Sequence, residues 1–168
     1  FEPVVAAAVI LPYSHQIEGL NDSKKLSPLQ REKAFEEIQK SASAIGVGIT
    51  DQVTIDSINI LQATYLAMRS ALFQINLSID LVLVDGYSIP GLDWKQEGII
   101  GGDAKSASIA AASIIAKVTR DRIMIEFSQK YPEYNFQNHK GYGTKEHQEA
   151  LLKYGPCPLH RKSFRPIS

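Results

Sequence analysis

The chain has 168 residues, enough for one domain of ordinary size, and 44% of them are apolar, which is sufficient to build a core. Its 18 basic and 18 acidic residues give a formal net charge of zero, which excludes a protein that binds nucleic acid through its overall charge. The single cysteine, Cys157, excludes an intrachain disulfide and a zinc site built from cysteines. No apolar run is long enough to cross a membrane, and we expect a reduced, cytoplasmic protein.

The first third of the chain predicts two strands with a helix between them. Val4–Leu11 is a continuous apolar run rich in β-branched residues, as expected of a strand that is buried on both faces. Ser27 stands at an N-cap position, Pro28 occupies the first helical position, and Gln30 completes a capping box. Ala44–Thr50 then predicts a second, short strand.

The remainder continues the alternation of helices and strands. Residues 51 to about 76 have a helical pattern, in one or two pieces, and strands are expected at Leu81–Val84 and around Ile99. A long helix follows over about 106–129, and a last helix runs from Thr144 to Tyr154. This alternation indicates a single α/β domain over 1–168, and the irregular tail from 156 onward is basic.

Apolar side chains in the 51–76 segment recur at three- and four-residue spacing, which is typical of the core-facing stripe of a helix. The members of this stripe are Ile58, Leu61, Tyr65, Met68 and Leu72. Trp94, in a loop further along, is expected to be an apolar anchor.

Two aspartates follow successive predicted strands. Asp85 comes directly after the apolar run Leu81–Val84, and Asp103 follows two glycines just before the long helix. Ligands in open α/β sheets bind at the carboxyl ends of strands, and carboxylate oxygens suit a hard cation such as Mg²⁺ or Mn²⁺. Each residue could instead be an ordinary turn or helix-capping aspartate, and local sequence leaves both interpretations open.

Cationic and hydroxyl side chains are adjacent in two loops. Ser23, Lys24 and Lys25 lie in a polar segment after the first strand, and Lys105 and Ser106 directly follow Asp103. Either group could hold phosphates. The alternatives are a solvated charged loop for the first group and a simple N-cap for Ser106.

The C-terminal region offers an aromatic loop and a basic tail. Tyr142 lies between two glycines, where its ring could stack on a sugar or base, or could anchor the loop to the core. No acidic residue follows Glu149, whereas the tail carries several basic ones. This is the one asymmetric charge cluster, and it could contact a nucleic-acid backbone.

Together these segments resemble the ribonuclease HII family, in the family's order and over nearly the whole chain. The matching stretches are Val4–Pro12, Leu20–Ser27, Asn59–Thr64, Leu83–Gly86, Gly102–Ser106, Ala111–Arg122, His139–Thr144 and Tyr154–Pro158. The resemblance implies an RNase H-like fold, which is a mixed five-stranded sheet flanked by helices.

The resemblance also implies an endonuclease that hydrolyses the RNA strand of RNA–DNA hybrids, including single ribonucleotides in duplex DNA. Two Mg²⁺ or Mn²⁺ ions held by four carboxylates would carry out catalysis and leave 5′-phosphate and 3′-hydroxyl ends. Asp85 and Asp103 match two of the four ligands. Tyr142 matches the tyrosine that contacts the sugar at the RNA–DNA junction. Ser23, Lys24, Lys25, Lys105 and Ser106 match substrate-contacting segments, and we expect a monomer.

The sequence departs from the family at its start. The family's other two ligands lie in an Asp-Glu-Ala-Gly-Arg-Gly motif on the first strand, upstream of Val4, and that motif is not in these 168 residues. Glu2 stands where the family usually has glycine, and the missing role does not pass to it. We therefore expect a truncated chain that lacks a central strand and has impaired activity.

Two other functions are compatible with parts of the sequence. A catalytically dead fragment could still bind hybrids through Lys24, Lys25 and Tyr142. An aspartyl-phosphate phosphotransferase with Asp85 as its nucleophile would usually have a second aspartate two residues later, but Tyr87 occupies that position.

Overall fold

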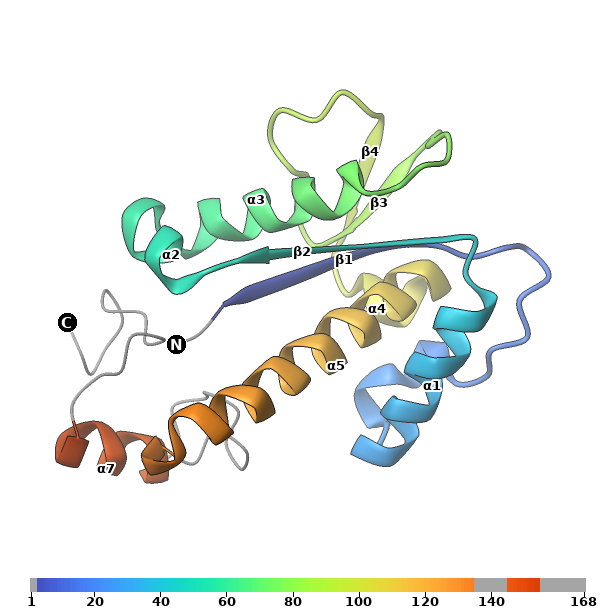
Figure 1. The fold of residues 1–168 in the computed structure, drawn as a ribbon. Helices are drawn as coiled ribbons and strands as arrows, with labels where there is room; N and C mark the ends of the chain where they lie inside the picture. The colour runs from blue at the N-terminus through green and yellow to red at the C-terminus, as the bar shows by residue number, and fades with distance from the viewer. Residues whose placement is uncertain (1–2, 135–144, 155–168) are drawn as a thin grey trace.

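The structure is a computed structural model that describes residues 3–134 and 145–154, without the side chains of 21, 22, 134 and 145–147 (Figure 1). The elements follow one another as β1 Val4–Ile10, η1 Leu20–Lys25, α1 Pro28–Ser41, β2 Ala44–Thr50, α2 Gln52–Ile58, α3 Ile60–Phe73, β3 Val82–Asp85, β4 Gln96–Ile99, α4 Gly102–Lys105, α5 Ala107–Lys130, η2 Pro132–Tyr134 and α7 Lys145–Tyr154. The predicted α/β alternation is confirmed, and the 51–76 segment forms two helices.

Strands β1 and β2 form an antiparallel pair that is covered on both faces. The pair is in register from Val4 opposite Thr50 to Ile10 opposite Ala44. Helix α3 lies on one face, and α5 lies on the other with α1 beside it (Figure 1). This two-sided burial explains why the first strand is apolar throughout rather than alternating.

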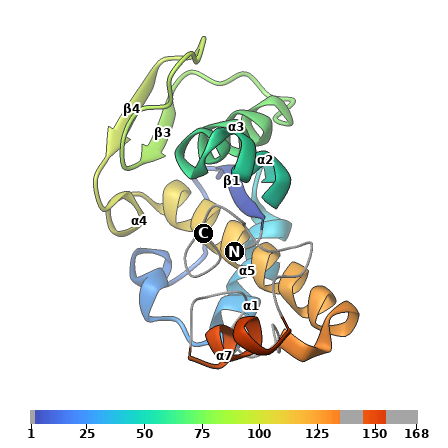
Figure 2. The same ribbon diagram turned by 90° about the vertical axis from the view of Figure 1, so that its left-hand side faces the viewer.

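Strands β3 and β4 form a second, parallel pair, from Val82 opposite Gln96 to Asp85 opposite Ile99. The part of the chain that the structure describes therefore holds four strands in two separate two-stranded sheets. Figure 2 shows the β3–β4 pair standing to one side of β1. The predicted strand around Ile99 is confirmed in part, because it begins earlier than expected, at Gln96.

Helix α3 packs its backbone closely against β2. A methyl group on Gly46 or Gly48 would collide with the main-chain carbonyl oxygen of Ala71 or Ala67 respectively. Only glycine at these two strand positions lets the α3 backbone come this close to β2. The close approach places a row of small α3 residues against the sheet. The buried residues of this helix are Ala63, Ala67, Ala71 and Leu72.

The predicted core stripe of this region is therefore wrong in part. Leu72 is buried, but Ile58 and Leu61 are exposed, at 37% and 55% of their surface. The spacing rule assigned the core face to the largest apolar side chains. The two strand glycines instead select the alanine face, because only short side chains fit between the closely packed backbones.

Local sequence signals set the helix starts. Ser27 and Gln30 form the predicted capping box, with the Ser27 N–H donating to Gln30 Oε1 at 2.9 Å and the Gln30 N–H donating to Ser27 Oγ at 3.2 Å. Asp51 caps α2 by accepting from the Thr54 N–H at 2.8 Å. Asn59 then ends α2 and caps α3, with a left-handed φ of 75° that splits the helical segment in two.

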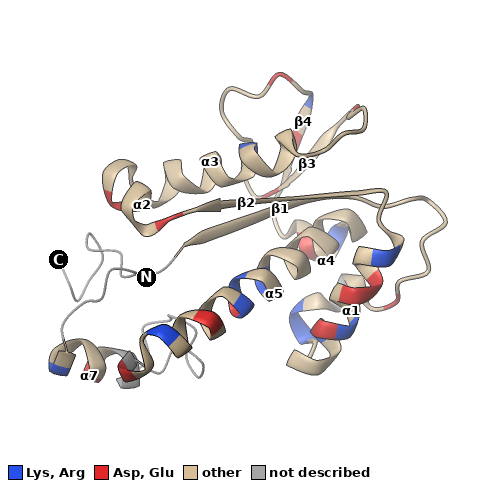
Figure 3. Ribbon diagram, in the orientation of Figure 1, with Lys and Arg blue, Asp and Glu red and all other residues tan. Residues whose placement is uncertain are grey.

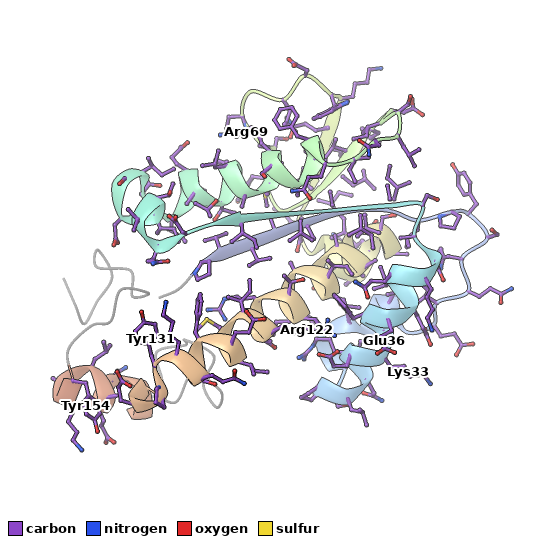
Figure 4. The ribbon with its side chains drawn as sticks, viewed as in Figure 1. Lys33, Glu36, Arg69, Arg122, Tyr131 and Tyr154 are labelled. Carbon is purple, nitrogen blue, oxygen red and sulfur yellow. The ribbon has the colours of Figure 1, made fainter. Side chains whose placement is uncertain are left out.

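Helices α1 and α5 are joined by packing and by one ion pair. Phe35 and Ile38 of α1 are buried against α5, in the core cluster that also contains Ile114 and Val118. Arg122 of α5 lies over the Phe35 ring, 4.3 Å from its centroid, and pairs with Glu32 at 2.6 Å. In Figure 4 the labelled Arg122 lies between the two helices.

Two smaller expectations can be checked in the described residues. Trp94 packs against the cluster of Leu72, Val82, Val84 and Ile89, so its role as an apolar anchor is confirmed. Among the residues described, no helix combines the length and apolar character that crossing a membrane requires.

Candidate metal and nucleic-acid site

Asp85 lies at the carboxyl end of β3, as predicted. Val82 and Val84 are buried on one face of this strand, and the strand delivers Asp85 to its exposed end. Asp85 Oδ1 accepts a hydrogen bond from the backbone N–H of Gly102 at 3.1 Å. The end of β3 is thereby tied to the start of α4, which is the helix that contains Asp103.

The glycine pair before Asp103 shapes this junction. Gly101 caps α4 with a left-handed φ of 67°, a conformation that a residue with a side chain adopts at a cost. At Gly102 the problem is space, because a Cβ would lie 2.7 Å from Ile109 Cδ1 and 3.4 Å from Asp85 Oδ1. The second glycine therefore allows Asp85 to reach the backbone directly before Asp103.

Asp103 is a buried carboxylate held by a lysine. The residue is 6% exposed, and its Oδ2 lies 3.4 Å from Lys24 Nζ. A buried charge is costly without a partner. Lys24 is 80% exposed, so water screens the pair and weakens it.

The predicted substrate-binding residues that the structure describes lie on η1, at the end of α4 and at the start of α5. Ser23 is buried within η1, next to exposed Lys24 and Lys25, and η1 packs against α4. Lys105 donates to the Ile100 carbonyl at 3.0 Å. Ser106 caps α5, with its Oγ accepting from the Ile109 N–H at 3.3 Å, so the N-cap alternative is confirmed for its hydroxyl.

The carboxylate pair fits a hard divalent cation. Mg²⁺ is commonly held by one or two carboxylates, with water and substrate phosphates completing the octahedron. Asp85 has one oxygen engaged by a backbone N–H, and Asp103 has one oxygen paired with Lys24. Within the described residues no third His, Cys, Asp or Glu joins them in a group that could hold a metal ion.

Charge around the site is mixed rather than basic. Figure 3 shows Lys or Arg together with Asp or Glu on α1, α4 and α5. Lys117 and Asp121, which lie four residues apart on α5, form an ion pair at 3.4 Å. The cations that could attract a phosphate backbone near the aspartates are those of η1 and α4.

One feature of the site could not be located from local sequence, and three predicted features lie outside the described residues. Short helix α4 places Asp103 inside a helical turn rather than before the long helix, and only the Gly-Gly pair hinted at it. Tyr142, the start of the last helix at Thr144, and the tail 156–168 lie outside the described residues.

Comparison with known proteins identifies the family. A family model described as Ribonuclease HII matches residues 1–167. The ribonuclease HII of Caldicellulosiruptor bescii is 57% identical over 162 residues, which are 96% of this chain and 79% of that protein. The match to the family model spans the strands, the aspartates and the lysine loops described above.

Two solved structures share the fold. The ribonuclease H2 of Pyrococcus horikoshii OT3 has a TM-score of 0.75 at 26% identity and covers 99% of this chain and 90% of its own. The RNase HII of Archaeoglobus fulgidus, solved in complex with PCNA, has a TM-score of 0.75 at 25% identity, with coverage of 98% and 88%. The chain has an RNase H-like fold and belongs to the ribonuclease HII family, the ribonucleases that act on RNA–DNA hybrids.

Proposed function

We propose that this site hydrolyses the RNA strand of RNA–DNA hybrids, including single ribonucleotides in duplex DNA, and leaves 5′-phosphate and 3′-hydroxyl ends. One observation carries the proposal: Asp85 accepts from the backbone N–H that directly precedes Asp103, so the end of β3 is joined to the residue next to the second carboxylate. Family membership supports the substrate class.

Asp85 and Asp103 are the residues that would hold Mg²⁺ or Mn²⁺. When bound, such ions activate a water for in-line attack and stabilise the leaving oxygen of the phosphodiester. The hydrogen bond from Gly102 fixes the direction in which Asp85 presents its other oxygen. Burial keeps Asp103 in one orientation, so its carboxylate is organised before substrate arrives.

Lys24 would act as a placeholder and then as a phosphate contact. Its ammonium neutralises Asp103 at 3.4 Å while its side chain remains in water. A divalent cation at Asp103 would displace it by like-charge repulsion. The released lysine, with Ser23, Lys25, Lys105 and Ser106 nearby, would then contact the substrate backbone.

The experiment is cleavage of three labelled duplexes: an RNA–DNA hybrid, a DNA duplex with one ribonucleotide, and an all-DNA duplex. We expect cleavage of the first two with Mg²⁺ or Mn²⁺, none with EDTA, and none of the third, because only RNA carries the 2′-hydroxyl. Asp85→Asn and Asp103→Asn should abolish cleavage, whereas Asp80→Asn, at an exposed position of the loop before β3, should not. Equal cleavage of all three duplexes would refute the proposal.

A second candidate is a fragment that binds hybrids without cleaving them. It is compatible with the described residues, among which no group of three or more His, Cys, Asp or Glu could hold a metal ion. We accordingly propose that cleavage by these 168 residues is weak. Saturable hybrid binding in EDTA, with no cleavage in Mg²⁺, would establish the second candidate over the first.

The cellular setting is also a proposal. We place the protein in the cytoplasm as a monomer, acting on RNA–DNA hybrids and on ribonucleotides in duplex DNA. The single cysteine and the zero net charge are compatible with this setting. Sedimentation velocity across micromolar concentrations tests the monomer, and a concentration-dependent shift to a dimer would refute it.

A further inference from the structure

Two large apolar side chains are exposed at the end of the β3–β4 pair that carries Asp85. Tyr87 is 78% exposed and Ile100 is 67% exposed. Asp85 lies opposite Ile99 in the parallel register, and the N–H of the next residue, Gly86, donates to the Ile99 carbonyl at 2.9 Å. Tyr87 and Ile100 directly follow the two residues that this hydrogen bond joins. We call these two side chains the apolar shelf.

The backbone that carries Tyr87 is held by the turn after β3. A Cβ on Gly98 of β4 would lie 2.5 Å from the Gly86 carbonyl oxygen, so the start of this turn packs directly on the β4 backbone. Further along, Ile89 is 3% exposed, its N–H donates to Gln96 Oε1 at 2.6 Å, and its carbonyl accepts from Gln96 Nε2 at 2.7 Å. The turn is therefore anchored on both sides of Tyr87, while the Tyr87 side chain remains exposed.

The backbone of Ile100 is held as well. Its carbonyl oxygen accepts from Lys105 Nζ at 3.0 Å, and the carbonyl of the residue before it is the acceptor for Gly86. Side chains on a backbone that is already fixed lose less conformational freedom when they bind a ligand. The apolar shelf is thus organised in advance beside Asp85, as expected of a binding surface.

The charge around the shelf differs from that around Asp103. Residues 82–90 and 98–103 contain no lysine or arginine. The lysines of the site, Lys24, Lys25 and Lys105, belong to η1 and to the end of α4, and Lys105 marks the boundary because it bonds the shelf backbone. Helix α4 contacts both β3 and η1, and Figure 2 shows it between the strand pair and the segment that contains η1. The site therefore has a cationic side that can attract phosphates and an apolar side that can contact only uncharged parts of a nucleic acid.

We propose that the apolar shelf packs against a deoxyribose of the bound duplex and thereby favours duplexes that contain DNA over an all-RNA duplex. The inference rests on the proposed function, because it concerns the same substrate surface. The 2′-hydroxyl distinguishes a ribose from a deoxyribose at any given contact. The Ile100 side chain and the face of the Tyr87 ring have no donor or acceptor for that hydroxyl, so a ribose buried there would leave it without a hydrogen-bond partner. A deoxyribose presents only C–H groups at this position and incurs no such cost.

The test is duplex binding by the 168-residue chain in EDTA, followed by fluorescence anisotropy. Three labelled duplexes of the same length and sequence are compared: DNA with one ribonucleotide, an RNA–DNA hybrid, and an all-RNA duplex. We expect Tyr87→Ala and Ile100→Ala each to weaken binding of the two duplexes that contain DNA by about fivefold or more. Binding of the all-RNA duplex should change by less than about twofold, because the shelf contributes little to it.

Salt dependence and a conservative variant separate this role from a phosphate contact. Because the shelf is uncharged, Tyr87→Ala should weaken binding by the same factor at every salt concentration, whereas loss of a phosphate contact lowers the slope of log K against log salt by about one. Tyr87→Phe keeps the ring face and removes the hydroxyl, so it should bind within about twofold of the unsubstituted chain. A Tyr87→Phe variant as weak as Tyr87→Ala would assign the contact to the hydroxyl and overturn the inference.

A matched control lies on α7. Leu152→Ala removes another exposed apolar side chain, 86% exposed, and Figure 1 shows α7 at the far end of the 24-residue helix α5 from α4. This variant should bind all three duplexes like the unsubstituted chain. Circular dichroism verifies that each variant is folded. Hydrogen exchange needs no variant: peptides that cover 86–92 should gain protection when the DNA duplex with one ribonucleotide is added, and those that cover 148–154 should not.

The outcomes separate the shelf from the proposed function. Equal losses for the DNA-containing and all-RNA duplexes, or Tyr87→Ala binding that matches the unsubstituted chain, would overturn the shelf alone, because the unsubstituted chain still binds. If the unsubstituted chain binds none of the duplexes, the proposed substrate surface fails and the shelf fails with it. Binding is measured without metal, so the result of the cleavage assay does not alter this test.

Discussion

The glycine between the two aspartates provides the sharpest mutational test of the site. In Gly102→Ala the new methyl group would lie 2.7 Å from Ile109 Cδ1, which is too close for two carbon atoms, and 3.4 Å from Asp85 Oδ1. Ile109 is only 4% exposed, so its side chain has little room to retreat. Overpacking of this kind costs about 1–3 kcal/mol.

Rescue by a second substitution distinguishes this clash from a general defect. Ile109→Val removes the Cδ1 atom and alone costs about 0.5–1.5 kcal/mol. The double variant should therefore be more stable than the sum of the two single effects predicts, with a coupling of about 1 kcal/mol or more. Urea unfolding of the four proteins, followed by circular dichroism, measures the cycle. Additive effects, or an alanine variant as stable as the original, would refute the reasoning.

Three further predictions concern other parts of the fold. Gly48→Ala should destabilise the protein by about 3 kcal/mol or more, because the new methyl group meets main-chain atoms of Ala67 that cannot move aside. Urea unfolding measures this effect, and a loss below about 1 kcal/mol would contradict the packing described. Asp51→Ala should cost about 1 kcal/mol at neutral pH through loss of the cap. The hydrogen bonds from the Thr54 backbone and side chain lower the pKa of Asp51, so the stability that Asp51 contributes is present above the ordinary aspartate range and is lost as pH falls through the lowered value. Unfolding measured from about pH 7 to 2 should show this loss. A difference in stability between the original and the alanine variant that widens on acidification would contradict it. Lys24→Met should weaken hybrid binding and its dependence on salt, measured by anisotropy, whereas unchanged binding would remove Lys24 from the proposed substrate surface.

Sequence reasoning located the aspartates because both follow signals that are local. An apolar run that ends in Asp85 and a glycine pair before Asp103 are visible without a structure. Their proximity is not local, because it depends on one hydrogen bond from the Gly102 backbone. The ion-pair partner of Asp103 could not be predicted from local sequence either, since Lys24 lies 79 residues earlier in the chain.

The sequence predicts the helices and strands of the fold better than it predicts how they pack against one another. Capping at Ser27 and the boundaries of β1 and β2 follow from residue chemistry along the chain. The buried face of α3 does not, because it is selected by Gly46 and Gly48 on a different element. Strand pairing is likewise set by tertiary contacts, and the described strands form two separate pairs around a groove.

The central claim is that Asp85 and Asp103 form one metal site, and Mn²⁺ titration followed by electron paramagnetic resonance tests it most directly. Asn at position 85 can still accept from Gly102, so Asp85→Asn keeps the geometry while removing the charge. We predict that Asp85→Asn and Asp103→Asn each remove most of the Mn²⁺ binding and that the double variant loses little more, because the two carboxylates hold the same ion. Independent, additive losses from the two substitutions, or Mn²⁺ binding that survives both, would contradict the account.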